Sequence, residues 1–214
     1  MIDILFENND YLACIKPVGI ASQNDKSEDM VKILAEQTGG QIYPVHRLDT
    51  AVGGTMIFAK NAKYAAILSK QIQDGTFKKR YLAVVSGIPE EKSGIFEDLL
   101  FKDSKKNKSF VVKRERKGVK KAKLEYELID TNSEKSLVRV LLHTGRSHQI
   151  RVQFASRKMP LTGDGKYGSQ DNRCTVALWS NEISFTDKSK VVSFSSEPDK
   201  EIYPWNLFYF DKEN

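Results

Sequence analysis

Hydrophobic and polar residues alternate along most of the chain, and this pattern predicts a succession of strands with a few helices between them. The first two strands are expected to form a hairpin around the turn-forming residues Asn8-Asn9-Asp10. A strong β-forming core follows in Tyr81-Leu82-Ala83-Val84-Val85. The expected strands are 2–7, 10–16, 55–59, 79–86, 94–101, 109–113, 120–130, 136–143, 174–185 and 191–195.

Helical periodicity and capping residues predict where the strands are interrupted. The first helix is expected to begin with Ser27 as its N-cap and to end at Gly39-Gly40. The second is expected to have Asn61 as its N-cap and Gly75 just beyond its last turn. The expected helices are 27–38, 61–73 and 147–157, with a closing helical segment at 204–210.

The mixture of strands and helices predicts an α+β fold with a mixed, largely antiparallel sheet flanked by helices and loops. A chain of 214 residues can bury its core as one large domain or as two small ones. The sequence contains no internal repeat, low-complexity tract or Pro/Gly/Ser-rich linker. We therefore expect one domain over residues 1–214; if the chain forms two lobes, the boundary is expected at residues 86–94.

The composition is that of an ordinary folded protein, with 40% hydrophobic and 29% charged residues. No apolar run approaches the ~18 residues that would predict a membrane span. Acidic residues stand near the N-terminus, where a secretory signal would carry Lys or Arg. The cysteines Cys14 and Cys174 form no CxxC pair and stand in apolar sequence, which favours buried thiols. A reducing, cytoplasmic location is expected.

Positive charge is concentrated in one segment of the chain. Eleven basic and two acidic residues lie between Lys102 and Lys123, so this segment has a net charge of +9 while the whole chain has +6. A field this localised favours a polyanionic partner, and the apolar patch Phe110-Val111-Val112 argues against disorder. Short strands with basic loops are expected here, a shape that suits a phosphate backbone; a solvated lysine-rich loop is the alternative. The candidate contacts include Lys105, Lys106, Lys113 and Arg114.

Three other stretches concentrate residues that are suited to chemistry. The first, His46-Arg47-Leu48-Asp49, is followed by glycines and a strand, although an acid in a turn is more often a cap or a surface pair. The second, Leu142 to Arg151, places two arginines and two histidines at a helix start, where positive charge opposes the helix dipole unless an anion compensates. The third, residues 163–168, is typical of a Gly-rich turn with Asp164 as an Asx cap.

Taken together, the motifs resemble those of the RluA-type family of RNA pseudouridine synthases, and the resemblance extends over nearly the whole chain. Several motifs in the same order as in the family are specific for it, whereas any one of them alone would not be. The matching segments are 15–19 (Ile-Lys-Pro-Val-Gly), 46–49 (His-Arg-Leu-Asp), 79–87 (Lys-Arg-Tyr-Leu-Ala-Val-Val-Ser-Gly), 144–151 (Thr-Gly-Arg-Ser-His-Gln-Ile-Arg), and 163–164 with 167–168 (Gly-Asp and Tyr-Gly). The family usually has Thr-Ser-Gly-Leu after the second motif; this chain has Ala51-Val52-Gly53-Gly54, which leaves the choice of RNA open.

The resemblance implies an enzyme that converts uridine to pseudouridine with Asp49 as its catalytic carboxylate, acting as nucleophile or base. Arg151 is expected to pair with Asp49 and keep it ionised, and Ile150 to form an apolar wall against uracil. Tyr81 is expected to stack on the flipped base and place its hydroxyl near the C5 proton. Arg47 is expected to occupy the space that the flipped base leaves.

The remaining RNA-binding candidates are His46, Lys16 and Arg146, of which Arg146 either meets RNA or supports its turn. Isomerisation oxidises nothing and removes no group, so no redox cofactor and no metal is expected. His143 and His148 are poorly spaced for a metal site, with no carboxylate or Cys close in sequence. The expected partner is tRNA or rRNA, with no membrane, and the protein is expected to be a monomer without a separate N-terminal RNA-binding domain.

Two other functional classes remain open. One is a catalytically inactive RNA-binding or ribosome-assembly protein on the same fold, against which the intact Asp49, Tyr81 and Arg151 argue. The other is an Asp-dependent hydrolase of unrelated fold, which would need a second group to activate water. Release of free uracil would identify the hydrolase, and RNA binding without a modified base would identify the inactive protein. The sequence leaves open which uridine reacts and whether the carboxylate attacks C6, attacks C1′ or removes the 2′-proton.

Overall fold

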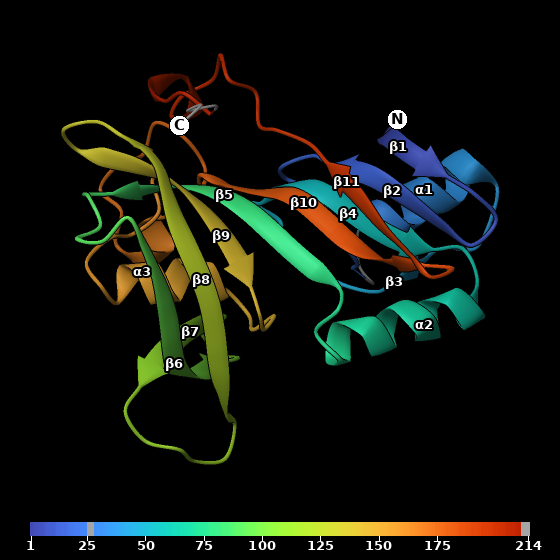
Figure 1. Ribbon diagram of the computed structural model, residues 1–214, viewed down its shortest axis with the longest axis horizontal. Coiled ribbons are helices and arrows are strands. Elements are labelled where there is room, and N and C mark those ends of the chain that lie inside the picture. The colour runs from blue at the N-terminus through green and yellow to red at the C-terminus, as the bar shows by residue number, and fades with distance from the viewer. Residues whose placement is uncertain (25–27, 211–214) are drawn as a thin grey trace. The chain divides into compact units, whose positions relative to one another are not determined.

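The computed structural model describes residues 1–24 and 28–210, and these form three α-helices, eleven strands and two short 3-10 helices (Figure 1). The helices are α1 (Met30–Thr38), α2 (Ala62–Gln73) and α3 (Gln149–Ala155), and the 3-10 helices are η1 (Gly165–Tyr167) and η2 (Trp205–Leu207). The strands are β1 (Asp3–Glu7), β2 (Tyr11–Lys16), β3 (Tyr43–Pro44), β4 (Gly53–Ala59), β5 (Lys78–Ser86), β6 (Ser93–Asp103), β7 (Lys108–Val112), β8 (Val119–Thr131), β9 (Lys135–Leu142), β10 (Leu178–Asp187) and β11 (Lys190–Ser195).

The chain divides into two compact units. The first contains residues 1–80 and 179–198, and the second contains residues 81–178 together with the segment that begins at residue 199. Strands β5 and β10 each pass from one unit into the other. The division therefore falls inside β5, earlier than the boundary that the sequence suggested at residues 86–94. A single catalytic domain over residues 1–214 stays a prediction.

The first unit is built on strands in the order β1-β2-β4-β10, with β11 paired to β10 and β3 paired to β4. Most pairs are antiparallel, but β4 and β10 run parallel. Every residue of β4 is buried, which explains why its sequence, Gly-Gly-Thr-Met-Ile-Phe-Ala, does not alternate between polar and apolar. Tyr64 and Leu68 of α2 pack against a core that includes Tyr11, Ile57 and Phe185.

The second unit orders its strands β5-β9-β8-β6-β7. The pairs β8–β9, β6–β8 and β6–β7 are all antiparallel. Helix α3 covers one face of this sheet, where Phe154 packs edge-on to Phe96 and Tyr126 with ring centroids 5.0 and 5.8 Å away. Figure 1 shows the loop between β7 and β8 extending beyond the ends of the strands.

The predicted α+β class and the mixed, largely antiparallel sheet are confirmed. Asn61 caps α2 as expected, since its side chain accepts the N–H of Tyr64 at 2.8 Å, and Gly75 follows with φ +73°. The N-cap of α1 is Asp29, which accepts the N–H of Lys32 at 2.9 Å; Ser27, the predicted cap, lies outside the described residues.

Two elements, α3 and β10, are shorter in the structure than the sequence predicted. Helix α3 covers only residues 149–155 of the predicted 147–157, because His148 before it takes a left-handed backbone conformation with φ +53°. Strand β10 begins at Leu178 and not at residue 174. Two short elements, β3 and η1, were not predicted, and the closing helical segment is reduced to η2.

The cysteines differ in their surroundings. Cys14 is fully buried in β2 as predicted, and burial raises the pKa of its thiol to about 12. Cys174 is only partly buried, so the expectation of two buried thiols was wrong for this residue. Among residues 1–24 and 28–210, no helix is both long and apolar enough to cross a membrane.

Candidate active site

Asp49 lies on a tight turn that leads into β4. The turn is closed by the N–H of Val52, which donates to the carbonyl of Asp49 at 2.9 Å. The preceding residue, Leu48, is buried, and both its N–H and its carbonyl bind the hydroxyl of Ser22 at 3.0 and 2.9 Å. Asp49 itself is half-buried. The backbone on both sides of Asp49 is therefore fixed.

A glycine is required directly after this turn. Gly54 has φ +115°, and a Cβ at this position would lie 2.4 Å from the carbonyl oxygen of Ser180 on the parallel strand β10. Only glycine permits this approach and this backbone conformation. The chain differs from the family's usual sequence at Ala51-Val52-Gly53-Gly54. It nevertheless has a glycine at position 54, where the pairing of β4 with β10 requires one.

Lys16 is fully buried at the end of β2, on the strand next to the Asp49 turn. Its ammonium group donates to the carbonyls of Pro17, Ile20 and Thr50 at 2.8, 2.6 and 3.4 Å. Burial lowers the pKa of Lys16 to about 8, and the negative charge of Asp49 opposes this shift. The sequence grouped Lys16 with the RNA contacts, which stays a prediction; in the structure its charge is enclosed and bonded to the turn that carries Asp49.

His46 and Arg47 precede Asp49 and differ in exposure. The Nε2 atom of His46 accepts the N–H of Ile57 at 3.1 Å, and its ring packs against Phe77 with centroids 5.5 Å apart. Burial, together with the positive charge of Lys79, lowers the pKa of His46 to about 3, so the ring is neutral. His46 is thus held by contacts within the protein, and its predicted contact with RNA stays a prediction. Arg47 is exposed, as a residue that meets RNA must be.

Arg151 of α3 forms a buried ion pair with Asp164 in the second unit. Its Nε and Nη2 donate to the two carboxylate oxygens of Asp164 at 2.7 and 2.8 Å, and the two side chains are 8% and 1% exposed. The guanidinium also lies 5.2 Å from the ring centroid of Tyr167. The sequence predicted an Asx cap for Asp164, which was wrong: its side chain caps nothing in η1 and binds Arg151 instead.

The turn before α3 is held mainly by Gln149. Its side-chain oxygen accepts the N–H of Arg146 at 3.1 Å and the hydroxyl of Thr144 at 2.7 Å, and its amide donates to the carbonyl of Lys123 at 3.1 Å. The exposed Arg146 adds a bond from Nε to the carbonyl of Lys121 at 3.0 Å. Of the two roles that the sequence left open for Arg146, the structure contains the contact that supports the turn.

Tyr81 and Ile150 are both buried in the second unit, with 5% and 3% of their surface exposed. Tyr81 opens the buried run of β5, and Ile150 lies in the first turn of α3, next to Arg151. Their predicted roles, stacking on the flipped base and forming an apolar wall against uracil, stay predictions.

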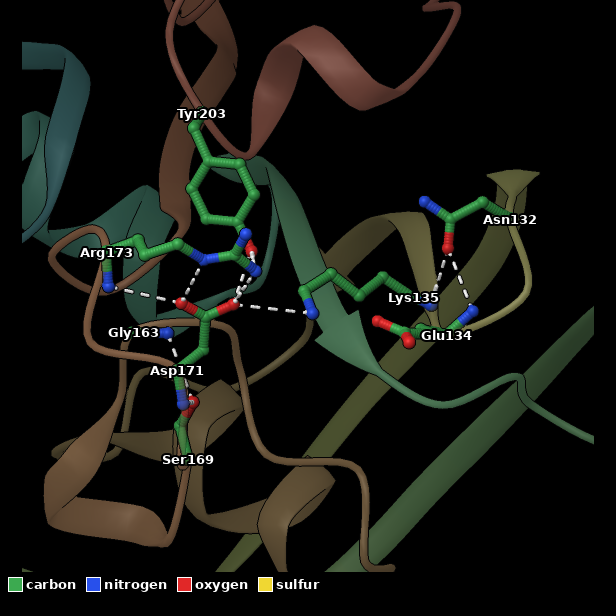
Figure 2. Close-up of polar contacts among 8 residues, drawn as sticks. All are labelled: Asn132, Glu134, Lys135, Gly163, Ser169, Asp171, Arg173 and Tyr203. Carbon is green, nitrogen blue, oxygen red and sulfur yellow. Dashed lines mark hydrogen bonds and ion pairs between the residues drawn. The ribbon is translucent and has the colours of Figure 1, made fainter.

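The loop that carries Asp164 is anchored by a second carboxylate that the sequence analysis missed (Figure 2). Asp171 accepts hydrogen bonds from Arg173 at 2.8 to 3.1 Å and from the hydroxyl of Tyr203, and it pairs with Lys135 at 3.4 Å. The hydrogen bonds from Arg173 and Tyr203 hold the pKa of Asp171 well below its usual range. Ser169 receives the N–H of Asp171 at 3.3 Å. The loop is thereby tied to β9 and to the C-terminal segment.

The basic segment forms the end of the β6–β7–β8 sheet, as the pattern of short strands and loops predicted. Lys105 and Lys106 lie in the turn between β6 and β7, where Asp103 accepts both their N–H groups at 2.9 and 3.1 Å. Lys113 and Arg114 lie in the loop between β7 and β8. All four side chains are exposed. Within the described part of the chain, no cluster of His, Cys, Asp or Glu could hold a metal ion.

Comparison with known proteins gives a family match over most of the chain. Residues 10–156 match the family described as RNA pseudouridylate synthase. The ribosomal large subunit pseudouridine synthase D of Borreliella burgdorferi is 31% identical, over 100% of this chain and 71% of its own length. The tRNA pseudouridine synthase C of Haemophilus ducreyi is 30% identical, over 85% of this chain and 81% of its own length.

One further relative and one solved structure are also similar to this chain. An uncharacterized RNA pseudouridine synthase of Bacillus subtilis, YhcT, is 35% identical over 78% of this chain, which spans only 58% of that relative's length. A solved structure, human RNA Pseudouridylate Synthase Domain Containing 1, superimposes with a TM-score of 0.80 over 97% of this chain and 87% of that chain. Its sequence identity is 19%, so this likeness supports the fold alone.

Proposed function

Because the chain belongs to the RNA pseudouridylate synthase family, we propose that it isomerises uridines of rRNA or tRNA to pseudouridine, with Asp49 as the catalytic carboxylate. The reaction breaks the C1′–N1 and C5–H bonds and forms the C1′–C5 and N1–H bonds, so the C5 proton leaves, N1 gains a proton and the composition does not change. The observation that carries the proposal is the position of Asp49, held on a fixed turn that a buried lysine ammonium group supports. A carboxylate fixed in this way suits nucleophilic or base catalysis.

The substrate must expose its uracil before Asp49 can act on it. Extruding a base from stacked or paired RNA costs roughly a few kcal/mol. We assign the vacated space to Arg47, whose exposed guanidinium directly precedes the catalytic turn. Tyr81 and Ile150 are assigned to the uracil ring, and Arg151 to stabilising the negative charge that the reaction requires. These four roles follow from the motif positions.

Lys16 has a different part in the proposal, because its charge is enclosed. The ammonium group links the carbonyls of Pro17, Ile20 and Thr50 and lies close enough to Asp49 to feel its charge. We assign Lys16 to positioning: it holds the turn in shape and keeps a positive charge beside the carboxylate. RNA does not need to touch it.

Replacing Lys16 by Met is expected to slow single-turnover pseudouridine formation by about 10- to 100-fold, because a displacement of about 1 Å at the catalytic turn is enough for such a loss. RNA affinity should stay within about twofold of wild type. Burial lowers the pKa of Lys16 to about 8, so the wild-type rate should fall as the pH rises through about 8, when the ammonium group loses its proton. The Met variant should lack this decline.

A matched control is Lys63→Met, which removes an exposed lysine of α2 and should leave both the rate and its pH profile unchanged. If Lys16→Met weakened RNA binding and left the rate at saturating RNA intact, the original assignment of Lys16 to RNA contact would be correct and positioning would be excluded.

Replacing Lys105, Lys106, Lys113 and Arg114 by Gln is expected to weaken RNA binding and to flatten its salt dependence. The slope of log affinity against log salt should decrease by about 0.7 to 0.9 for each phosphate that the variant no longer neutralises. The rate at saturating RNA should change little, because these exposed side chains dock RNA and do not react. Filter binding between about 50 and 200 mM salt measures the slope.

The control for total charge replaces four exposed lysines of the first unit by Gln. These are Lys63, Lys70, Lys188 and Lys190. Equal losses in the two quadruple variants would mean that RNA affinity follows net charge, and the basic segment would then be only a solvated loop.

A further inference from the structure

The β6–β7–β8 sheet has two faces, and the faces differ in what covers them. On one face, Leu100 and Ala122 pack against Val152 and Tyr167 from α3 and η1. Side chains that alternate with these point to the opposite face. There, Ile95 near the start of β6 is 57% exposed. We call this the outer face of the sheet.

Aromatic and aliphatic side chains run across the outer face toward the loop between β7 and β8. Phe101 of β6 stands directly opposite Phe110 on one side and Val119 on the other. Leu99 stands opposite Val112 and Lys121 in the same way. Paired positions of neighbouring strands place their side chains on the same face. Phe110 is 37% exposed, and the other apolar residues of these two rows are partly exposed.

A cation lies over one of these rings. The guanidinium of Arg116 is 4.8 Å from the ring centroid of Phe101. The ammonium of Lys108 is 5.8 Å from the ring centroid of Phe110, but it lies closer to Tyr167 of η1, at 5.0 Å, and donates to the carbonyl of Lys166. Beside them is a shallow hollow of about 470 Å³. Its lining residues are Leu99, Glu115, Arg116, Val119 and Lys121. The outer face therefore combines exposed aromatic rings, a guanidinium over one of them and a recess, and it lies within the most positive segment of the chain.

We propose that the outer face is a stacking platform for unpaired nucleotides of the RNA. A duplex exposes only phosphates and groove edges, and basic loops are sufficient to bind it. An unpaired base also offers two flat faces, which stack on aromatic rings and guanidinium planes. The outer face offers such stacking surfaces in the rings of Phe101 and Phe110 and in the planar group of Arg116. The inference rests on the proposed function in one respect, that the substrate is RNA.

The test measures RNA binding without the chemical reaction. The probe is a labelled RNA decamer of alternating adenosine and cytidine, which contains no uridine. It is used as a single strand and as a duplex with a complement in which 5-methyluridine, whose C5 carries no hydrogen, replaces every uridine. Phe110→Leu keeps an apolar side chain and removes the flat ring; Arg116→Lys keeps the charge and removes the planar group. Because stacking a base on an aromatic ring contributes about 5- to 150-fold in affinity, each variant should weaken single-strand binding at least about fivefold.

Duplex affinity should change by less than about twofold in both variants, since the phosphate contacts remain. Ile95→Ala is the matched control: it removes an exposed apolar side chain from the same face, away from the cations, and should leave both affinities unchanged. Thermal unfolding of each variant verifies the fold. Single-strand affinity that survives Phe110→Leu, or equal losses for strand and duplex, would overturn the proposal.

The result is independent of the proposed isomerisation, because the decamer cannot react. If the platform exists but the activity does not, the variants will lose affinity for the decamer while no pseudouridine forms in any RNA. If the activity exists without the platform, uridine-containing RNA will be modified equally fast by wild type and by Phe110→Leu at subsaturating concentration.

Discussion

Asp49→Asn is expected to reduce pseudouridine formation by roughly 10⁴-fold or more, because the amide keeps the shape of the carboxylate but has neither its charge nor its nucleophilicity. RNA affinity should remain within about threefold of wild type, since the carboxylate contributes little to docking. Release of tritium from C5-labelled uridine in RNA under single-turnover conditions measures the reaction directly.

The fold of the Asn variant can be checked independently. The turn is closed by the backbone of Asp49 and Val52 and by Ser22 on Leu48, none of which involves the carboxylate. A melting temperature within a few degrees of wild type would verify that the variant is folded. Substantial tritium release by a folded Asn variant would remove Asp49 from its catalytic role and leave the proposed mechanism without its central group.

Arg151→Leu is expected both to destabilise the protein and to suppress catalysis. The substitution leaves Asp164 as a buried carboxylate, 1% exposed, without its bidentate guanidinium. Breaking a buried pair in this way typically costs about 3–5 kcal/mol, against a total stability of about 5–15 kcal/mol for a domain. Loss of activity in the single variant alone would therefore not separate the chemical role of Arg151 from its structural one.

The double variant Arg151→Met with Asp164→Leu separates them. Replacing both buried charges by apolar groups of similar size is often neutral or stabilising, so this protein should unfold at or above the temperature of the single variant. It should nevertheless form pseudouridine at least about 100-fold more slowly than wild type, because the guanidinium is absent. Arg146→Leu removes an exposed guanidinium and one bond to the carbonyl of Lys121, so as the control it should destabilise the protein less than Arg151→Leu and lower RNA affinity more than turnover. A folded double variant with normal turnover would restrict Arg151 to a structural role.

Local sequence signals predicted most of the fold because the decisive interactions are local. Asn61 caps the helix that follows it, and its side chain reaches an N–H only three residues away. Alternation predicted β6 and β8 because one face of that part of the sheet packs on α3 and the other does not. Where β10 begins depends instead on pairing with distant strands, and the estimate at residue 174 was wrong.

The candidate site was less predictable, because its polar groups are satisfied by partners that are distant in sequence. Asp164 was interpreted as a cap from its glycine neighbours, whereas its partner Arg151 is 13 residues away on α3. The bond from Lys16 to Thr50 spans 34 positions, and a lysine in a Lys-Pro-x-Gly segment looks like a surface cation until its burial is known. One signal was available for Lys16 in the sequence: it directly follows the apolar run Tyr11-Leu12-Ala13-Cys14-Ile15.

The central claim is tested most directly by mapping pseudouridines in RNA from cells that lack this gene and carry either the wild-type chain or its Asp49→Asn variant. We predict that at least one uridine of rRNA or tRNA is converted in the wild-type cells and remains uridine in the variant cells. Identical maps in the two strains, with both proteins present in equal amounts and bound to RNA, would contradict the account and identify an RNA-binding protein without isomerase activity.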